Sequence, residues 1–253
     1  MKPAMIGGVL VAMAALLSAT SLAASASDYV QAGGPPANQA WTVADYEKFN
    51  ELASSGRIEL PMLGSDETRP IFLALVNRNA LARYSDKLTS LDDRAHWCGR
   101  TYNALSLVMM KYAEQHNSGK ADCSREMARV TAFMLHTATV MVNLTREMPP
   151  ANANDEFGQR RMRLLASMKE SYRILWRNAA AALSQRNVRA EEETLLMAEA
   201  MIEELPAQSE FIGPASVQEI GAKTAALVEK EGNDKVKLAL RRLLMTCNSL
   251  AAQ

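Results

Sequence analysis

The feature that most constrains this chain is the regular recurrence of helix-starting and helix-ending residues over residues 41–253. Thr42 is a good helix cap, and Ser90 is a cap followed by a carboxylate three residues later. The Pro149-Pro150 pair ends a helix, because proline removes a backbone donor and crowds the preceding turn. The expected helices cover about 42–56, 70–87, 90–117, 123–148, 154–186, 189–205, 214–231 and 234–250.

Strands are not predicted in this part of the sequence. No run of residues alternates between apolar and polar between turn signals, which is the pattern of a half-buried strand. Aromatic residues make up only 6% of the chain, whereas the helix-favouring Ala, Leu, Met, Glu and Arg are abundant. The sequence therefore predicts an all-α protein in which about six to seven of these helices form a single, mostly antiparallel bundle with short connections.

Residues 1–26 have the pattern of an export signal. Lys2 precedes an uncharged apolar run, and Ala24-Ser25-Ala26 offers the small residues that a signal peptidase reads. An uncleaved membrane anchor is the alternative, because an apolar run of this length could just span a bilayer. We expect cleavage near Ala26, which would leave no transmembrane segment and would place the protein in the periplasm or outside the cell.

The segment that follows, residues 27–40, is expected to be flexible. Its stretch GGPP at 33–36 cannot continue a helix and has little apolar surface to bury. The predicted organisation is therefore a signal peptide over 1–26, this flexible segment, and one helical domain over 41–253. That domain is long enough to bury a substantial core.

The charge of the mature chain argues against nucleic acid as a partner. The sequence contains 28 basic and 28 acidic residues, and loss of Lys2 with the leader leaves a formal charge of −1. A chain so close to neutral has no long-range field that would gather a polyanion or an anionic membrane. We therefore expect a protein partner in the cell envelope and no nucleic acid.

Four methionines recur at intervals of seven in the helix expected over 123–148. They are Met127, Met134, Met141 and Met148. At about 100° per residue they share one narrow face, which is the pattern of an inward-facing helix. Consecutive members cannot bind one metal ion, because they lie about 10.5 Å apart along the axis and metal–sulfur bonds are only about 2.3 Å long. The methionines thus predict core packing, and the lining of an adaptable binding groove is the minority alternative.

Three cysteines, Cys98, Cys123 and Cys247, would lie in an oxidising compartment. A Cys98–Cys123 disulfide is unfavourable, because an antiparallel hairpin would separate these residues by roughly 27 Å, and bridged Cα atoms lie within about 7 Å. If each helix reverses the one before it, Cys98 and Cys247 lie at the same end of the bundle. We therefore hypothesise a Cys98–Cys247 disulfide, with three buried free thiols as the alternative.

The helices expected over 154–186 and 189–205 carry opposite charges. The first is rich in Arg, whereas residues 190–210 hold seven Glu and no basic residue. We expect the two helices to pair antiparallel and to neutralise each other, with a phosphate-binding strip as the alternative for the basic helix.

Arg161 fits poorly in the helix expected over 154–186, because it projects into the apolar face of that helix. Either its guanidinium reaches solvent past that face, or it needs a buried carboxylate partner.

No arrangement of residues predicts a catalytic centre, a metal site or a cofactor. His96 and His116 lie about 30 Å apart on nearly opposite faces of one helix, so they cannot share a ligand. The sequence contains no HExxH, no paired CxxC and no phosphate-binding glycine loop. His136 belongs to a polar strip on the side of its helix away from the methionines, which is a candidate partner-binding surface. The strip comprises Arg125, Arg129, His136, Asn143 and Glu147.

These observations support three hypotheses for function. The first is an exported, non-enzymatic protein that binds another macromolecule in the cell envelope, as an inhibitor, an immunity factor or an accessory of assembly. The second is a carrier of a small apolar ligand or lipid between helices, which a cavity lined by Met134, Met141 and Leu164 would favour. The third is a helical enzyme whose carboxylates lie far apart in sequence and converge in a cleft.

Overall fold

The computed structural model describes residues 29, 32–150, 156–184 and 191–252, and the expected signal peptide lies outside these ranges. Regular structure in the described residues is helical, so the protein is all-α, as predicted. None of these helices has both the length and the apolar character needed to cross a membrane. The elements are α2 (Val43–Ser54), α3 (Arg69–Leu75), α4 (Asn79–Ala82), the 3-10 turn η1 (Arg83–Ser85), α5 (Leu91–Asn117), α6 (Ser124–Glu147), α7 (Glu156–Ser184), α8 (Glu191–Ile212), α9 (Pro214–Lys230) and α10 (Asp234–Ala251).

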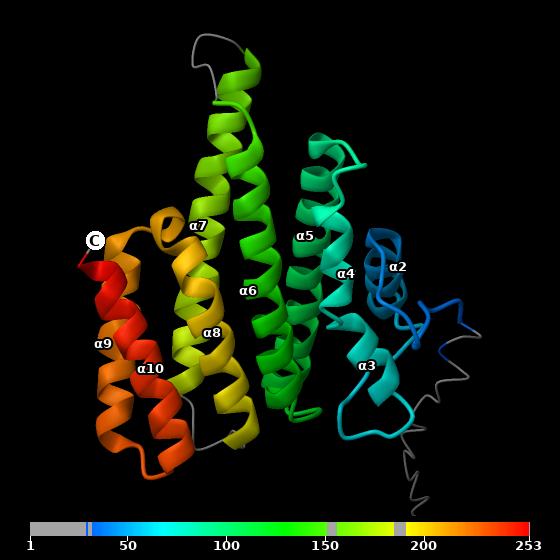
Figure 1. Ribbon diagram of the computed structural model, residues 1–253. Coiled ribbons are helices and arrows are strands. Elements are labelled where there is room, and N and C mark those ends of the chain that lie inside the picture. The colour runs from blue at the N-terminus through cyan, green and yellow to red at the C-terminus, as the bar shows by residue number, and fades with distance from the viewer. Residues whose placement is uncertain (1–28, 30–31, 151–155, 185–190, 253) are drawn as a thin grey trace, which may run out of the picture.

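The helix α6 lies at the centre of the bundle. It packs against α5 on one side and against α7 and α8 on the other, and consecutive long helices reverse direction (Figure 1). The pair α9 and α10 covers α7 and α8, while α2 covers α5 at the opposite edge. The last turns of α6 and the first turns of α7 project beyond the other helices (Figure 1). These projecting ends lack the outer helices that enclose the rest of the bundle.

Helix starts follow the capping signals of the sequence. Thr42 forms a capping box at α2 with the carboxylate three residues later. The Ser90 side chain accepts a hydrogen bond from the backbone N–H three residues on, at the start of α5, and Asn233 caps α10 in the same way. These side chains satisfy backbone donors that the first turn of a helix leaves free. The starts of these three helices therefore agree with the predicted boundaries.

The helix predicted over 70–87 is divided into α3, α4 and η1. Between α3 and α4 the side chain of Asn77 accepts a hydrogen bond from the backbone N of Asn79 at 3.0 Å. Such a local turn competes with continuation of the helix. The division brings the hydroxyl of Tyr84, in η1, to 2.6 Å from Thr101 Oγ1 of α5. A single straight helix is therefore the wrong prediction for this segment.

The helix α8 continues through Pro206, where the sequence predicted its end. An interior proline removes one backbone hydrogen bond and crowds the preceding turn. Gln208 and Ile212, which follow it, are nevertheless buried, so packing of this last part of α8 outweighs the local loss. The helix ends at Gly213, whose φ of 85° is a conformation that glycine adopts without strain.

The methionine repeat of α6 is only partly core. Met134 and Met141 are buried, as predicted, whereas Met127 and Met148 are half-buried. Met141 and Met148 also line an open cleft. The two alternatives for the repeat, core packing and groove lining, therefore apply to different parts of the same helix.

All three cysteines are buried free thiols, so the structure does not contain the hypothesised Cys98–Cys247 disulfide and agrees with the alternative. The direction argument was sound, because the start of α5 and the end of α10 lie at the same end of the bundle (Figure 1). The two cysteines are nevertheless far from each other, because α5 and α10 occupy different lateral positions in the bundle. Cys98 faces Thr137 of α6, whereas a Cβ at Gly221 of α9 would lie 3.2 Å from Cys247.

Part of the segment expected to be flexible, 27–40, packs against the helical domain. Tyr29 is buried in the core, and the indole N–H of Trp41 donates to Pro36 O at 2.8 Å. A Cβ at Gly34 would lie 2.3 Å from the ring of Tyr29. Glycine at this position therefore allows the backbone to pass directly over that ring.

Candidate functional site

An open cleft lies between α5, α6 and α7, on the side where α6 ends. Its volume is about 680 Å³, which is within the range of sites for small molecules. Most of its surface is apolar. The apolar side chains include Ala95 of α5, Met141 of α6, Met148 directly after α6, and Leu164, Leu165 and Met168 of α7.

The cleft remains unfilled because small residues of α5 and α7 line it, next to a pair of tyrosine rings at its inner end. Tyr102 of α5 and Tyr172 of α7 meet edge to face, with ring centroids 5.2 Å apart. Toward the mouth, the lining of α5 contains Ala95 and Gly99, and that of α7 contains Ser167. The tyrosine pair bridges α5 and α7, and the small residues fill little of the space beside it.

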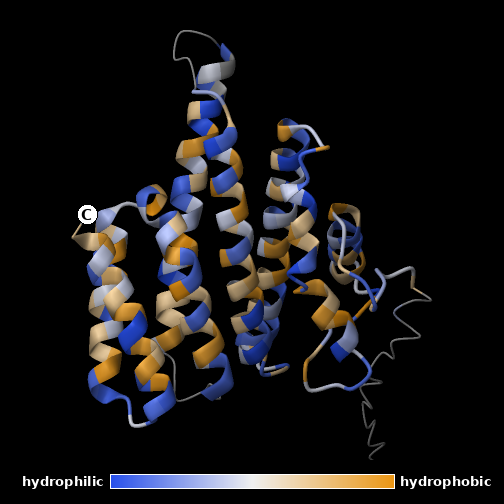
Figure 2. Ribbon diagram, in the orientation of Figure 1, coloured by the Kyte–Doolittle hydropathy of each residue, from blue (hydrophilic) through white to orange (hydrophobic). Residues whose placement is uncertain are grey.

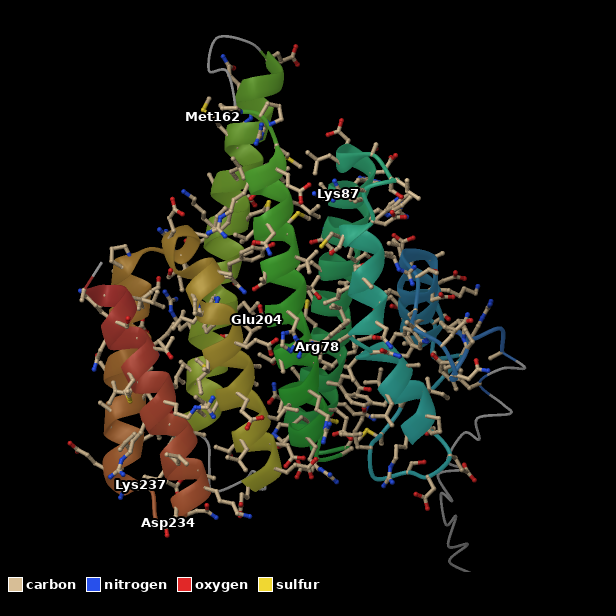
Figure 3. The ribbon with its side chains drawn as sticks, in the orientation of Figure 1. Arg78, Lys87, Met162, Glu204, Asp234 and Lys237 are labelled. Atoms are coloured by element: carbon tan, nitrogen blue, oxygen red, sulfur yellow. The ribbon has the colours of Figure 1, made fainter. Side chains whose placement is uncertain are left out.

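The apolar face predicted for α7 is only partly used for packing. Leu175, in its second half, is buried, whereas Leu164 is 60% exposed and Leu165 and Met168 line the cleft. Met162 is also exposed, on the projecting end of α7 (Figure 3), where apolar and polar residues are interspersed (Figure 2). An unpacked apolar stripe beside a concave surface is typical of a binding site.

Arg161 lies on the wall of the cleft and pairs with no carboxylate among the described residues. Its Nη2 donates to Thr145 O at 3.4 Å, and its Nε is buried without a hydrogen-bond partner. A guanidinium carries five N–H donors, so most of them remain available. Of the two predicted outcomes, the buried carboxylate partner is not found in the part of the chain that the structure describes. The side chain is half-buried in the cleft instead of extending fully into solvent.

Other charged side chains of the cleft are balanced or exposed. Arg100 donates two hydrogen bonds to Glu47, at 2.8 and 2.5 Å, so its charge is neutralised. Asp92 is exposed in the first turn of α5 and is the one carboxylate in the described lining. His96 follows it one turn later on the same face. The paired carboxylates that the enzyme hypothesis requires are therefore not found in this lining.

Two neutral phenols lie at the inner end of the cleft. Burial raises the pKa of Tyr102 and of Tyr172 above the usual range, so both are protonated at neutral pH. Tyr172 is only 2% exposed and lines the cleft. Its hydroxyl forms no hydrogen bond within the described part of the chain. The inner end of the cleft thus contains an unused hydrogen-bond donor but no charge.

The predicted partner-binding strip is largely engaged in contacts within the chain. Arg125 and Arg129 form ion pairs with glutamates in the first turn of α8, and Glu147 binds Arg94 of α5 at 3.1 Å. Asn143 is exposed. The Glu-rich α8 therefore pairs with arginines of α6, whereas the sequence predicted pairing with those of α7. Binding of a partner at the strip stays a prediction.

His136, the fifth residue of the strip, is buried between α6 and α8, where its Nδ1 forms a hydrogen bond with Glu204. Glu203 accepts two hydrogen bonds from Arg78, at 2.6 and 3.2 Å. Arg78 and Glu204 lie near each other between α8 and α4 (Figure 3). The histidine and both carboxylates offer ligand atoms within 4.8 Å of one another, a donor set that a divalent metal can use.

Arg78 makes this cluster a candidate structural ion-pair network. Its guanidinium, by hydrogen bonding to Glu203, lowers the pKa of that carboxyl below its usual value. The network joins the segment before α4 to α6 and α8. The sequence did not predict this network, because the polar side of α6 was interpreted as a partner-binding surface, whereas α8 packs against it.

Neither a protein-family model, nor a curated protein, nor a solved structure matches this chain. Function therefore has to be argued from the geometry alone. The cleft combines a volume of about 680 Å³, apolar walls and one cation that lacks a carboxylate partner among the described residues. A volume of this size is large enough to hold a small ligand.

Proposed function

We propose that this protein is an exported carrier that binds a small, largely apolar ligand or lipid in the cleft between α5, α6 and α7. The observation that carries the proposal is the cavity of about 680 Å³, lined by Met141 and Leu164. Met134, which the hypothesis also named, lies in the core instead. Methionine suits such a site, because its flexible side chain adapts to ligands of different shapes.

Binding of a macromolecule in the envelope is the second candidate. It is supported by Leu107 and Met110 of α5, which are 50% and 65% exposed. These residues follow Asn103, which lines the cleft, at helical spacing, so the apolar surface continues along α5. The carrier ranks first because a concave site can enclose a small molecule on several sides. Export is common to both candidates and is supported by the leader-like sequence over 1–26.

A variant that fills the cleft tests the proposal. Ser171 lines the cleft, is exposed, and donates its hydroxyl hydrogen bond only to Ser167 O of the same helix. The substitution Ser171→Trp therefore occupies the cleft without removing a contact between helices. We expect saturable binding of the apolar dye Nile red by the wild-type protein and binding at least about 10-fold weaker in the variant. Fluorescence titration measures both affinities.

Ala166→Trp is the matched control, because Ala166 is exposed on α7 outside the lining of the cleft. It introduces the same large side chain on the same helix, and we expect wild-type affinity for the dye. Circular dichroism should show that both variants keep the helical fold. Equal dye affinity in the two variants would place the binding site elsewhere and would refute the proposal.

A further inference from the structure

We infer that the ligand of the cleft is an anionic amphiphile with one apolar chain, and that Arg161 binds its charged head group. The inference rests on the proposed function of the cleft and adds the chemical class of the ligand. It starts from the contrast between the apolar walls and the single guanidinium that has no carboxylate partner in the described part of the chain.

The charge of the lining favours an anion at Arg161. Arg100 is already neutralised by Glu47, whereas Arg161 forms one hydrogen bond, at 3.4 Å, and pairs with no carboxylate among the described residues. The remaining Nη donors of its guanidinium have no acceptor in the described part of the chain. Carboxylate and phosphate oxygens fit a guanidinium in a bidentate manner. An anionic head group would therefore supply the acceptors that Arg161 lacks.

The apolar part of the cleft fits a chain of limited length. Tyr172 lies eleven residues after Arg161 on α7, a separation of roughly 16 Å along the helix. Leu165 and Met168 line the wall between these two levels, and Met141 lines the side of α6. The pair formed by Tyr172 and Tyr102 joins α7 to α5 at the inner end. An extended acyl chain of medium length can lie between the guanidinium and the rings.

A purely structural role for Arg161 makes a different prediction. Its bond to Thr145 O could serve only to cap the last turn of α6. Loss of such a cap would lower stability and would leave the choice among ligands unchanged. Selectivity for charge is therefore the measurement that separates the two roles.

The test compares ligands that share a chain and differ in the head group. Dodecanoate and dodecanol are titrated into the purified protein below their aggregation limits, by calorimetry or by displacement of Nile red. We expect dodecanoate to bind about 10- to 100-fold more tightly than dodecanol, because one head group forms charge-assisted hydrogen bonds. In Arg161→Met the affinity for dodecanoate should fall to that for dodecanol, and the affinity for dodecanol should not change.

Arg163→Met is the matched control, because Arg163 is an exposed arginine of α7 outside the lining. It should keep the wild-type preference for dodecanoate. Arg161→Lys, which keeps the charge, should keep part of that preference. A third ligand, dodecyl phosphate, distinguishes the source of the anion: tighter binding than dodecanoate indicates a phosphate head group, and weaker binding indicates a fatty acid.

The outcomes separate this inference from the proposed function. Equal affinity of the wild-type protein for dodecanoate and dodecanol would overturn the inference and leave the cleft as an apolar site. An unchanged preference in Arg161→Met would also overturn it. Absence of binding by all three ligands and by Nile red would overturn the proposed function itself. Binding only of an acidic helical peptide, tried in parallel, would favour a protein partner and would refute both.

Discussion

Burial controls the chemistry of the three cysteines. Cys98 lies against Thr137 O of α6, and burial raises its pKa to about 12. Burial likewise raises the pKa of Cys123 and of Cys247 to about 11. Thiolates are the reactive form of cysteine, so these thiols should be inert at neutral pH even in an oxidising compartment.

We expect none of the three cysteines to react with iodoacetamide in the folded protein at neutral pH, and all three to react after unfolding in urea. Mass spectrometry of the alkylated protein counts the modified thiols. Recovery of a peptide pair linked through Cys98 and Cys247 from unreduced protein would contradict the structure. It would restore the disulfide that the sequence suggested.

At single positions the sequence was informative where a residue conflicted with its surroundings. Arg161 stood out as a charge in an apolar face, and it now lies at the candidate site. His136 was assigned to a strip at which a partner would bind, yet it is buried beside Glu204. The reason is that α6 is the central helix, with neighbours on more than one side. The polar side of a helix is exposed to solvent only where no other helix covers it.

One buried amide joins three helices. Gln208 of α8 accepts a hydrogen bond from Trp176 Nε1 of α7 at 2.8 Å. Its Nε2 donates to Leu135 O and to Thr139 Oγ1 of α6, at 2.9 and 2.8 Å. Because Gln208 is buried, water cannot replace these partners if the amide is removed.

We expect Gln208→Leu to lower the free energy of unfolding by about 1–3 kcal/mol, since the indole N–H of Trp176 would be left without an acceptor. Urea denaturation followed by circular dichroism measures the change. Gln218→Leu is the control, because Gln218 is exposed on α9, and it should change stability by less than about 0.5 kcal/mol. Equal effects of the two substitutions would show that the amide network contributes little.

Individual helices were largely predictable, because their ends are encoded locally. Caps such as Thr42 and Asn233 fixed the starts of α2 and α10. Local signals failed where packing opposed them, as at Pro206, or where a side-chain turn interrupted a helix, as at Asn77. The charges of α7 and α8 suggested that they neutralise each other, but charge patterns do not specify which neighbour a helix faces.

For the whole molecule, the sequence predicted the class of fold and the alternation of helix directions. It could not predict lateral arrangement, because many bundles share one order of up and down helices. The error over Cys98 and Cys247 has this origin. The cleft could not be predicted for the same reason. The helices α5 and α7 are separated in sequence by the whole of α6, and they meet through Tyr102 and Tyr172.

The buried thiols and phenols should make the whole fold sensitive to alkali. The pKa of Cys98 rises from its ordinary value of 9.0 to about 12 on folding, and burial raises the pKa of Tyr46 and Tyr112 as well. The unfolded chain therefore releases these protons at lower pH than the folded protein. The stability that these groups contribute should therefore be fully present below pH 9 and decline as the pH rises toward 12.

Urea midpoints measured from neutral pH upward test this expectation. The midpoint should be level up to about pH 9 and then fall, and Cys98→Ala should make the fall shallower. A midpoint that stays constant well above the ordinary pKa of cysteine would show that the thiols and phenols are less buried than the structure indicates.

The absence of a side chain at Gly99 leaves the cleft wider between α5 and Met141. A Cβ there would lie 3.2 Å from the terminal methyl of Met141, so with alanine that methyl would have to shift by a few tenths of an ångström. The substitution Gly99→Ala, which needs only one nucleotide change, would narrow the cleft at this point and leave the helices in place. On the proposed function, a single substitution at this position would therefore change which ligands fit, while the surrounding architecture is inherited unchanged.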